Sequence, residues 1–437
     1  MSLRRVSAGV RSAERTHRRG RTVRVLTALA VGGAAAVAVA ALILTRPFAD
    51  APWDEAPPNP ASIYEPGASG ASTSTVVSPF HLETDPMAGL LLANFEEDPD
   101  RVYLGLEPQA FDDPVHGRGL LVIGWRVDGR VDVFHDPELR LDPETYRITG
   151  DGLHRMAERS FANALFELGP EGARVDLGFE DLEGREVRLV IRETDARPRR
   201  PFGLLAPMGH AVSDPPALPL VFLHDFYFVR RAGTEARIEI DGRLHRGDGL
   251  PLPIDRTRVH FHRYSPDPFI VTWNPEADAA DILQVDADAG PDISVEERGV
   301  RYELTSNGDQ REIRRMARSE GAHEVVVAFS PAFPDLRALR DGIEVSGAFR
   351  ISADPSVGTV TGRWTVERRD RQIHMEAVPE GGWTPGEVPP MARLMFRMVP
   401  MFRSWPGTYR WRGTLELPPP GPIEGLLPFR AGWERLE

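Results

Sequence analysis

From about residue 85 onward, apolar and polar side chains alternate with a period of two. The run from Leu120 to His135 reads LLVIGWRVDGRVDVFH, in which two alternating segments flank the dipeptide Asp128-Gly129. Asp-Gly suits the type I′ turn of a β-hairpin, because both central residues of that turn need positive backbone φ angles. Alternation of this kind buries one face of a strand and leaves the other face in water, so it predicts antiparallel sheets.

Similar segments continue toward the C-terminus, and another of them precedes a second turn dipeptide, Asp241-Gly242. We find roughly 18 to 20 short candidate strands, at the spacing that is typical of meandering sheets. The sequence therefore predicts an all-β, antiparallel fold of two packed barrel-like or sandwich halves, with few short helices and one preceding transmembrane helix. We assign the two halves to residues 81–260 and 261–437.

Helical periodicity is confined to short segments. Apolar side chains within residues 153–165 fit one helical face, and a second segment carries Met391, Met395 and Met398 at helical spacing after a Pro-Pro pair. Methionine side chains adapt to irregular apolar partners. We interpret this second helix as a lid over an apolar cavity; the alternative is an ordinary helix packed on a sheet.

The N-terminal region has the pattern of a membrane anchor. Residues 25–45 carry no charge, and a helix of this length, rising about 1.5 Å per residue, crosses a hydrocarbon core of roughly 30 Å. The Arg-rich tail, residues 1–24, places the N-terminus in the cytoplasm by the positive-inside rule. Residues 46–437 are then extracytoplasmic, and 46–80 read as a flexible linker rich in Pro, Ala, Gly and Ser. Cleavage near Ala51 is the alternative, with the same location for the β domain.

Charge and composition exclude several classes of function. The tail of residues 1–24 holds eight Arg and one Glu, a charge of +7, so the net charge of −13 leaves −20 for the remainder. An acidic body repels nucleic acid, and no nucleic-acid partner is expected. The chain has no cysteine, which excludes disulfides and thiolate metal sites. All of its 52 basic residues are Arg, so lysine Schiff-base chemistry is excluded. No cofactor is indicated.

The densest polar and aromatic region lies between residues 224 and 273. His224 lies on one side of a predicted strand, with Asp225 and Tyr227 on the other side, and these three residues are the catalytic candidates. His260 and His262 share one face of another strand, at a spacing that lets two imidazoles approach one metal ion. A third ligand would have to come from His224 or Asp225 on a neighbouring strand. The alternative is a half-exposed sheet face with no metal.

Candidate ligand-binding residues combine this region with the predicted lid. Tyr264 and Trp273 provide aromatic surface, and Met391, Met395 and Met398 provide the adaptable apolar side chains of the helix. Together they predict contact with an apolar ligand.

The strand segments GRWTVERRDRQIHMEA and GTYRWRGTLEL, with the closing segment PFRAGWERL, are similar to those of tandem lipocalin-like proteins, the family of carotenoid hydratases and AttH-type proteins. This resemblance implies two stacked barrels around a cavity for a lipophilic ligand, which in some members serves hydration or isomerisation. No specific family motif matches, so no catalytic residue is carried over, and the membrane anchor departs from the family pattern.

Three functional hypotheses follow. The first is a membrane-anchored protein that binds a lipophilic or envelope-derived small molecule in a barrel cavity. The second is a hydratase, isomerase or metal-dependent enzyme that uses the region of His224, His260 and His262. The third is a cell-envelope interaction module without a cavity. Whether the chain is an enzyme is left open by the sequence.

Overall fold

The structure is a computed structural model. It describes residues 46–49, 53, 55–66 and 75–436, except 196, 210–211, 252, 255, 287–289, 381 and 419–426. The chain divides into two units, residues 1–47 and 48–437, of which the second holds the β structure. The predicted tail (1–24) and membrane span (25–45) lie outside the described residues. No helix within the described ranges is long and apolar enough to cross a membrane.

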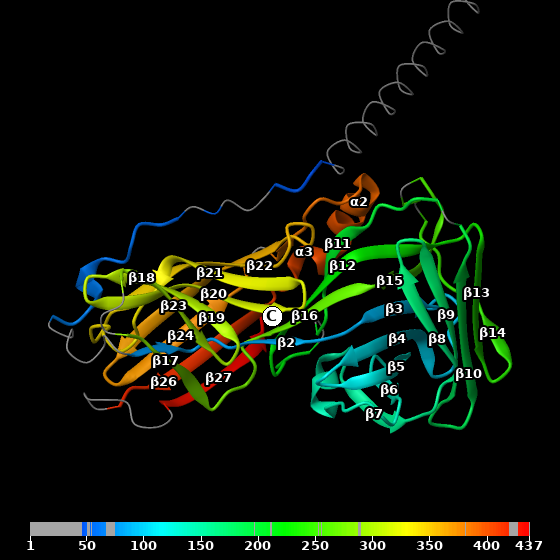
Figure 1. Cartoon of the computed structure of the whole chain (residues 1–437), viewed down its shortest axis with the longest axis horizontal. Coiled ribbons are helices and arrows are strands. Elements are labelled where there is room, and N and C mark those ends of the chain that lie inside the picture. The colour runs from blue at the N-terminus through cyan, green and yellow to red at the C-terminus, as the bar shows by residue number, and fades with distance from the viewer. Residues whose placement is uncertain are drawn as a thin grey trace, which may run out of the picture. The chain divides into compact units, whose positions relative to one another are not determined.

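Unit 48–437 is all-β, and its two large sheets curl into antiparallel half-barrels (Figure 1). Strand accounts for 57% of the described residues and helix for 6%, which confirms the all-β class that the period-two pattern predicts. The one parallel pair among the described strands is β6 with β7. The short helices are η1 (Ala61–Ile63), η3 (Pro143–Ile148), α2 (Pro390–Met398) and α3 (Pro400–Ser404).

The larger of the two sheets contains nearly all strands of the C-terminal part, drawn in yellow to red in Figure 1, together with the early strand β1. Its strand order is β1-β17-β27-β26-β24-β23-β22-β21-β20-β19-β18, and β25 pairs with β23. The bounds are β1 (Thr75–Ser78), β17 (Ala279–Gln284), β18 (Asp292–Glu297), β19 (Val300–Asn307), β20 (Gln310–Glu320), β21 (His323–Phe333), β22 (Glu344–Ser352), β23 (Thr359–Arg369), β24 (Gln372–Val378), β25 (Trp383–Thr384), β26 (Tyr409–Glu416) and β27 (Leu427–Arg435).

The other large sheet has the order β2-β16-β12-β15-β3-β4-β5-β6-β7, with β11 paired to β12. A separate five-stranded sheet, β14-β13-β10-β9-β8, packs on it through a second apolar core. The bounds are β2 (Leu82–Asp85), β3 (Gly89–Asn94), β4 (Tyr103–Asp113), β5 (Gly117–Arg126), β6 (Val131–His135), β7 (Leu153–Glu158), β8 (Ala162–Gly169), β9 (Gly172–Glu180), β10 (Glu186–Glu193), β11 (Phe202–Ala206), β12 (Leu218–Arg230), β13 (Thr234–Ile240), β14 (Arg243–His245), β15 (Val259–Ser265) and β16 (Asp267–Trp273).

Both predicted turn dipeptides join hairpin strands, β5 to β6 and β13 to β14. At Asp241-Gly242 the φ angles are 53° and 75°, as a type I′ turn requires. At the other dipeptide only Gly129 has a positive φ, of 85°, so that hairpin closes through a different turn. The sequence therefore placed both turns correctly, but the type I′ turn that it predicted at Asp128-Gly129 is wrong, and a turn of that kind occurs at Asp241-Gly242 instead.

One aromatic core fills the space between the two large sheets. Trp273 of β16 is fully buried, and its ring centroid lies 4.9 Å from that of Phe349 on β22 and 5.5 Å from that of Trp433 on β27. Phe80 stacks on Phe329 of β21 at 5.0 Å in the same core. Large aromatic side chains bury about 150–250 Å² each, so this core supplies much of the driving force that holds the sheets together.

Two local predictions differ from the structure. Residues 153–165, which fit a helical face, form β7 and part of β8, because β7 pairs in parallel with β6 and this pairing outweighs a short helical pattern. The described parts of the predicted linker 46–80 are ordered. Tyr64 donates to Glu312 Oε1 at 2.6 Å, and β1 buries Val76 and Val77 within the core.

The predicted boundary between residues 260 and 261 falls inside β15. In the structure the chain passes from one large sheet to the other between the end of β16 at Trp273 and the start of β17 at Ala279. Because both sheets belong to one compact unit, the division into two domains remains a prediction.

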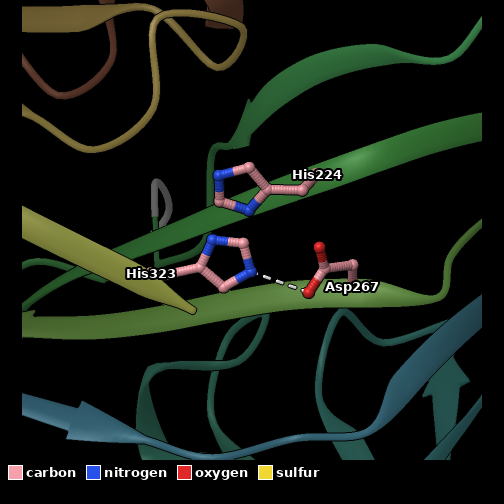
Figure 2. Close-up of side chains that lie close together, drawn as sticks. All are labelled: His224, Asp267 and His323. Atoms are coloured by element: carbon pink, nitrogen blue, oxygen red, sulfur yellow. Dashed lines mark hydrogen bonds and ion pairs between the residues drawn. The ribbon is translucent and has the colours of Figure 1, made fainter. Parts of the chain in front are cut away.

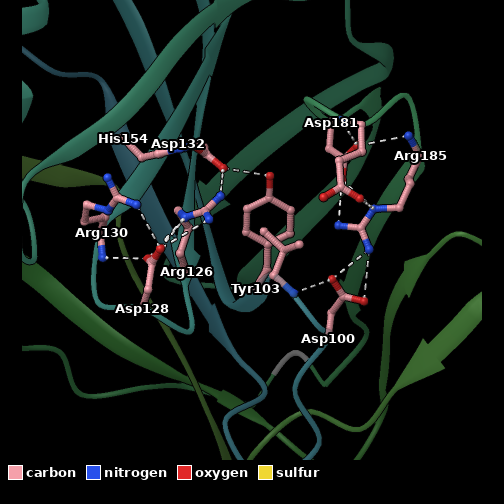
Figure 3. A network of polar contacts seen from close by, with 11 residues as sticks. Asp100, Tyr103, Arg126, Asp128, Arg130, Asp132, His154, Asp181 and Arg185 are labelled. Atoms are coloured by element: carbon pink, nitrogen blue, oxygen red, sulfur yellow. Dashed lines mark hydrogen bonds and ion pairs between the residues drawn. The ribbon is translucent and has the colours of Figure 1, made fainter.

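A buried polar network ties β4, β5, β6 and β7 together (Figure 3). Asp132 of β6 has no exposed surface, and it accepts from Tyr103 Oη at 3.0 Å, Arg126 Nη1 at 2.9 Å and His154 Nδ1 at 2.6 Å. Burial and the neighbouring carboxylate raise the pKa of Tyr103, so its hydroxyl stays a donor. One carboxylate thus satisfies groups from three other strands.

Replacement of Asp132 by Ala is expected to destabilise the fold by about 3–5 kcal/mol, because Tyr103 and the Arg126 charge lose their shared buried acceptor. Asp128→Ala is the matched control, since Asp128 binds the same Arg126 in an exposed loop, and its loss should cost less than about 1 kcal/mol. Urea unfolding of both variants measures the difference. Equal losses would contradict the assigned role of Asp132.

Candidate functional site

An open groove with a volume of about 470 Å³ lies beside α2 and α3. Its walls, as far as the structure describes them, combine aromatic rings with two guanidinium groups and contain no carboxylate. The lining residues are Phe48, Ala49, Trp383, Thr384, Pro385, Phe396, Arg397, Phe402 and Arg403. Ligand pockets in proteins usually measure about 300–1,000 Å³, so the groove is large enough for a small molecule.

Packing of α2 builds the floor of the groove. Pro390 occupies the first helical turn, where its missing N–H is not needed, and Ala392 and Phe396 are the buried side chains of the helix. The Phe396 ring lies 5.1 Å from Trp383 and 4.8 Å from Phe402, both in edge contacts. The indole N–H of Trp383 donates to the Val357 carbonyl at 2.7 Å, which fixes the orientation of the ring.

The charge of the groove comes from arginine. The Arg397 guanidinium lies 4.4 Å from the centroid of the Phe48 ring, which is a cation–π contact. Arg403 is exposed, and within the described part of the chain it forms no ion pair. A guanidinium offers a planar fork of donors that matches a carboxylate or phosphate. The groove can therefore hold an apolar group against aromatic walls and an anion at its arginines.

The predicted methionines lie on the helix of this groove, but none of the three is among its lining residues. Met391 and Met395 are half-buried and pack against the main core, whereas Met398 is 65% exposed. The helix itself is confirmed over Pro390–Met398. Met391 and Met395 therefore fit the alternative interpretation, an ordinary helix packed on the sheets, better than they fit a lid over a cavity.

Tyr264 and Trp273, the other predicted ligand-binding residues, lie in the interior. Trp273 belongs to the core between the sheets. Tyr264 stacks on Tyr227 with ring centroids 5.2 Å apart, and its hydroxyl donates to the Gly169 carbonyl at 3.0 Å and accepts from Arg199. Both side chains pack within the fold, and neither lines the groove.

The three predicted catalytic residues lie within four positions of the sequence, but their side chains occupy different environments. His224 and Tyr227 are buried, while Asp225 is exposed with a φ of 48°, so the strand is irregular at this point. His224 lies opposite Asp267 in the β12–β16 ladder, and Tyr227 lies opposite Tyr264 in the β12–β15 ladder. The structure therefore does not bring these residues together into one reactive group.

His260 and His262 do come together on β15, with parallel rings and centroids 5.1 Å apart. The third ligand does not join them, because His224 lies among other residues, and no group of three metal-ligating side chains in the described ranges includes either histidine. His262 is fully buried beside Gly247, where an added Cβ would stand 2.4 Å from His262 Nε2. The predicted three-ligand site is therefore not formed around this pair.

Comparison with known proteins adds no relative. No protein-family model, no curated protein and no solved structure matches this chain. The resemblance to tandem lipocalin-like proteins accordingly remains a prediction.

Sequence reasoning missed Phe48, Trp383, Phe402 and Arg403 of the groove. A partial signal existed, because Phe and Arg alternate with the methionines in the stretch after residue 390. Phe48, by contrast, is far from this stretch in sequence, and only the folded chain brings it beside Arg397.

His262 should make stability depend on pH. Burial, with smaller contributions from His260, Arg263 and Arg231, lowers its pKa from 6.5 to about 3 in the folded chain. Between about pH 3 and pH 6.5 this histidine is protonated in the unfolded chain but neutral in the folded chain. The free energy of unfolding therefore increases as the pH rises through this range. The slope from this one residue approaches about 1.4 kcal/mol per pH unit.

We expect His262→Leu to reduce that slope when urea unfolding is followed at pH values from 4.5 to 6.5. Phe261→Leu changes the neighbouring side chain without removing a titrating group and should keep the slope of the native sequence. An unchanged slope in His262→Leu would show that His262 is protonated in the folded chain.

Proposed function

We propose that this chain is a single-pass membrane protein whose extracytoplasmic β unit binds a lipophilic anion in the groove beside α2 and α3. The observation that carries the proposal is the composition of the groove: aromatic walls, two arginines and, among the described residues, no acidic side chain in the lining. Aromatic walls favour an apolar body, and the guanidinium groups favour a carboxylate or phosphate head.

The interior between the sheets is a less suitable place for the ligand. The side chains that face each other there include Trp273, Trp364, Trp411 and Phe80, all of them fully buried and packed in one core. Protein cores of this kind are close-packed, so a ligand would have to displace aromatic side chains. The groove requires no such displacement, and it therefore replaces the barrel cavity in the binding hypothesis.

The position of the groove along the chain fits a membrane-derived ligand. Phe48, one of its walls, follows the proposed span of residues 25–45 by three residues. Such a short connection in sequence between the proposed anchor and the groove favours a lipid-like ligand that comes from the membrane.

A fatty acid with a photoreactive diazirine in its tail tests the proposal on the full-length protein in phosphatidylcholine nanodiscs. We expect adducts on peptides from residues 383–403. Arg403→Gln should reduce the adduct yield at subsaturating ligand about tenfold or more, because a charge-assisted hydrogen bond contributes about 1.5–3 kcal/mol. Arg118→Gln, at an arginine 85% exposed on β5, is the matched control and should have no effect.

Competition distinguishes recognition of the anion from simple partitioning. An excess of the unlabelled acid should suppress the adducts, whereas its uncharged methyl ester should compete poorly. Adducts spread evenly over the β unit, or equal competition by acid and ester, would contradict the proposal.

A further inference from the structure

Three potential metal ligands from distant parts of the chain meet where the two large sheets join (Figure 2). His224 on β12 and Asp267 on β16 belong to one sheet, and His323 on β21 belongs to the other. Each side chain offers one ligand atom, and these three atoms all lie within 4.8 Å of one another.

The cluster is partly connected already. His323 Nε2 lies 2.7 Å from Asp267 Oδ1, and the His224 and His323 rings are nearly parallel, with centroids 4.0 Å apart. Two imidazoles stacked this closely beside a carboxylate repel each other when both are protonated. The arrangement therefore favours at least one neutral ring, which is the form that binds metal ions.

His224 provides the independent indication of a ligand. Its side chain is more than nine-tenths buried, and within the described part of the chain neither ring nitrogen makes a hydrogen bond of good geometry, although the Asp267 main chain lies close. An unpaired buried polar group costs about 1–3 kcal/mol, and native proteins leave few of them. A metal ion bound to one nitrogen would remove this cost.

The surrounding charges favour a cation. The carboxylates of Asp267 and Asp354 lie near enough to His224 to act on its charge, although burial and His323 lower the pKa of His224 overall. The negative charges of these two carboxylates would compensate the positive charge of a divalent ion. His323 and Asp267 keep 20% and 49% of their side-chain surface exposed, so they have room to turn toward a common centre.

We propose that His224, Asp267 and His323 form a binding site for a divalent transition-metal ion, with Zn²⁺ as the best match. Two histidines and one carboxylate are a ligand set of catalytic zinc sites, in which a fourth position stays open for water or substrate. Bond lengths of about 2.0–2.2 Å require the three side chains to close in from their present separations. The ion would join the two sheets, and Asp267 and His323 replace His260 and His262 of the sequence-based hypothesis.

Zinc binding to the untagged full-length protein tests this site, measured by titration calorimetry and by metal content after gel filtration. We expect one Zn²⁺ per chain. His323→Ala and Asp267→Asn should each weaken binding at least tenfold, and both positions are partly exposed, so these variants leave the core intact. His374→Ala, a histidine of β24 outside the cluster, and His260→Ala are the controls that should bind as the native sequence does.

Thermal unfolding gives a second readout that does not depend on activity. Zn²⁺ should raise the unfolding midpoint of the native sequence, because an ion that binds only the folded state stabilises it, and the rise should disappear in His323→Ala. Absence of stoichiometric zinc in the native protein would overturn the proposal. So would binding that is lost in His260→Ala and kept in His323→Ala, since that result would place the ion at the other pair.

Discussion

The packing of Trp273 against Phe349 and Trp433 joins the two large sheets of the β unit. Trp273 closes β16 in one sheet, and its two partners belong to β22 and β27 of the other. The hydrophobic effect that drives these contacts has no preferred direction. Close packing of the large rings, however, allows only one relative position of the strands that carry them. The rest of the unit depends on that position, including strand β1, which crosses from the N-terminal part to pair with β17.

Both candidate sites lie where the sheets meet. In the groove, Phe396 of α2 contacts Trp383 of the larger sheet and also Phe202 of β11, at a centroid distance of 6.2 Å. In the histidine cluster, His323 from one sheet stacks on His224 from the other. A site built across a junction has its geometry set by the packing of both sheets, so the binding residues need no rigid loop of their own.

The sequence predicted what local patterns determine. Alternation with a period of two predicted the all-β class, and the dipeptides at Gly129 and Gly242 predicted turns between strands. The spacing of three methionines predicted helix α2. The pairing of His260 with His262 also depends on local spacing, because residues two apart share one face of a strand. The period is ambiguous over a short segment such as 153–165, and there the prediction was wrong.

Contacts between distant segments left no such pattern. His323 and Asp267 are 56 residues apart, and His224 reaches them only because β12 lies beside β16 and the sheets face each other. Phe48 contacts Arg397 for the same reason. Tyr64 and Val76 are buried, although they belong to a stretch rich in Pro, Gly and Ser. The composition of this stretch predicts a flexible linker, but its few apolar side chains pack into the core and order the chain.

Native-state hydrogen exchange of the full-length protein tests the central claim most directly, which is that the two large sheets form one cooperative unit. The account predicts that amides of β12 around Leu220–Phe222 and amides of β21 around Val325–Val327 open with the same free energy and the same dependence on denaturant. Opening of β12 at distinctly lower free energy, with β21 still protected, would contradict it, because the sheets would then unfold independently.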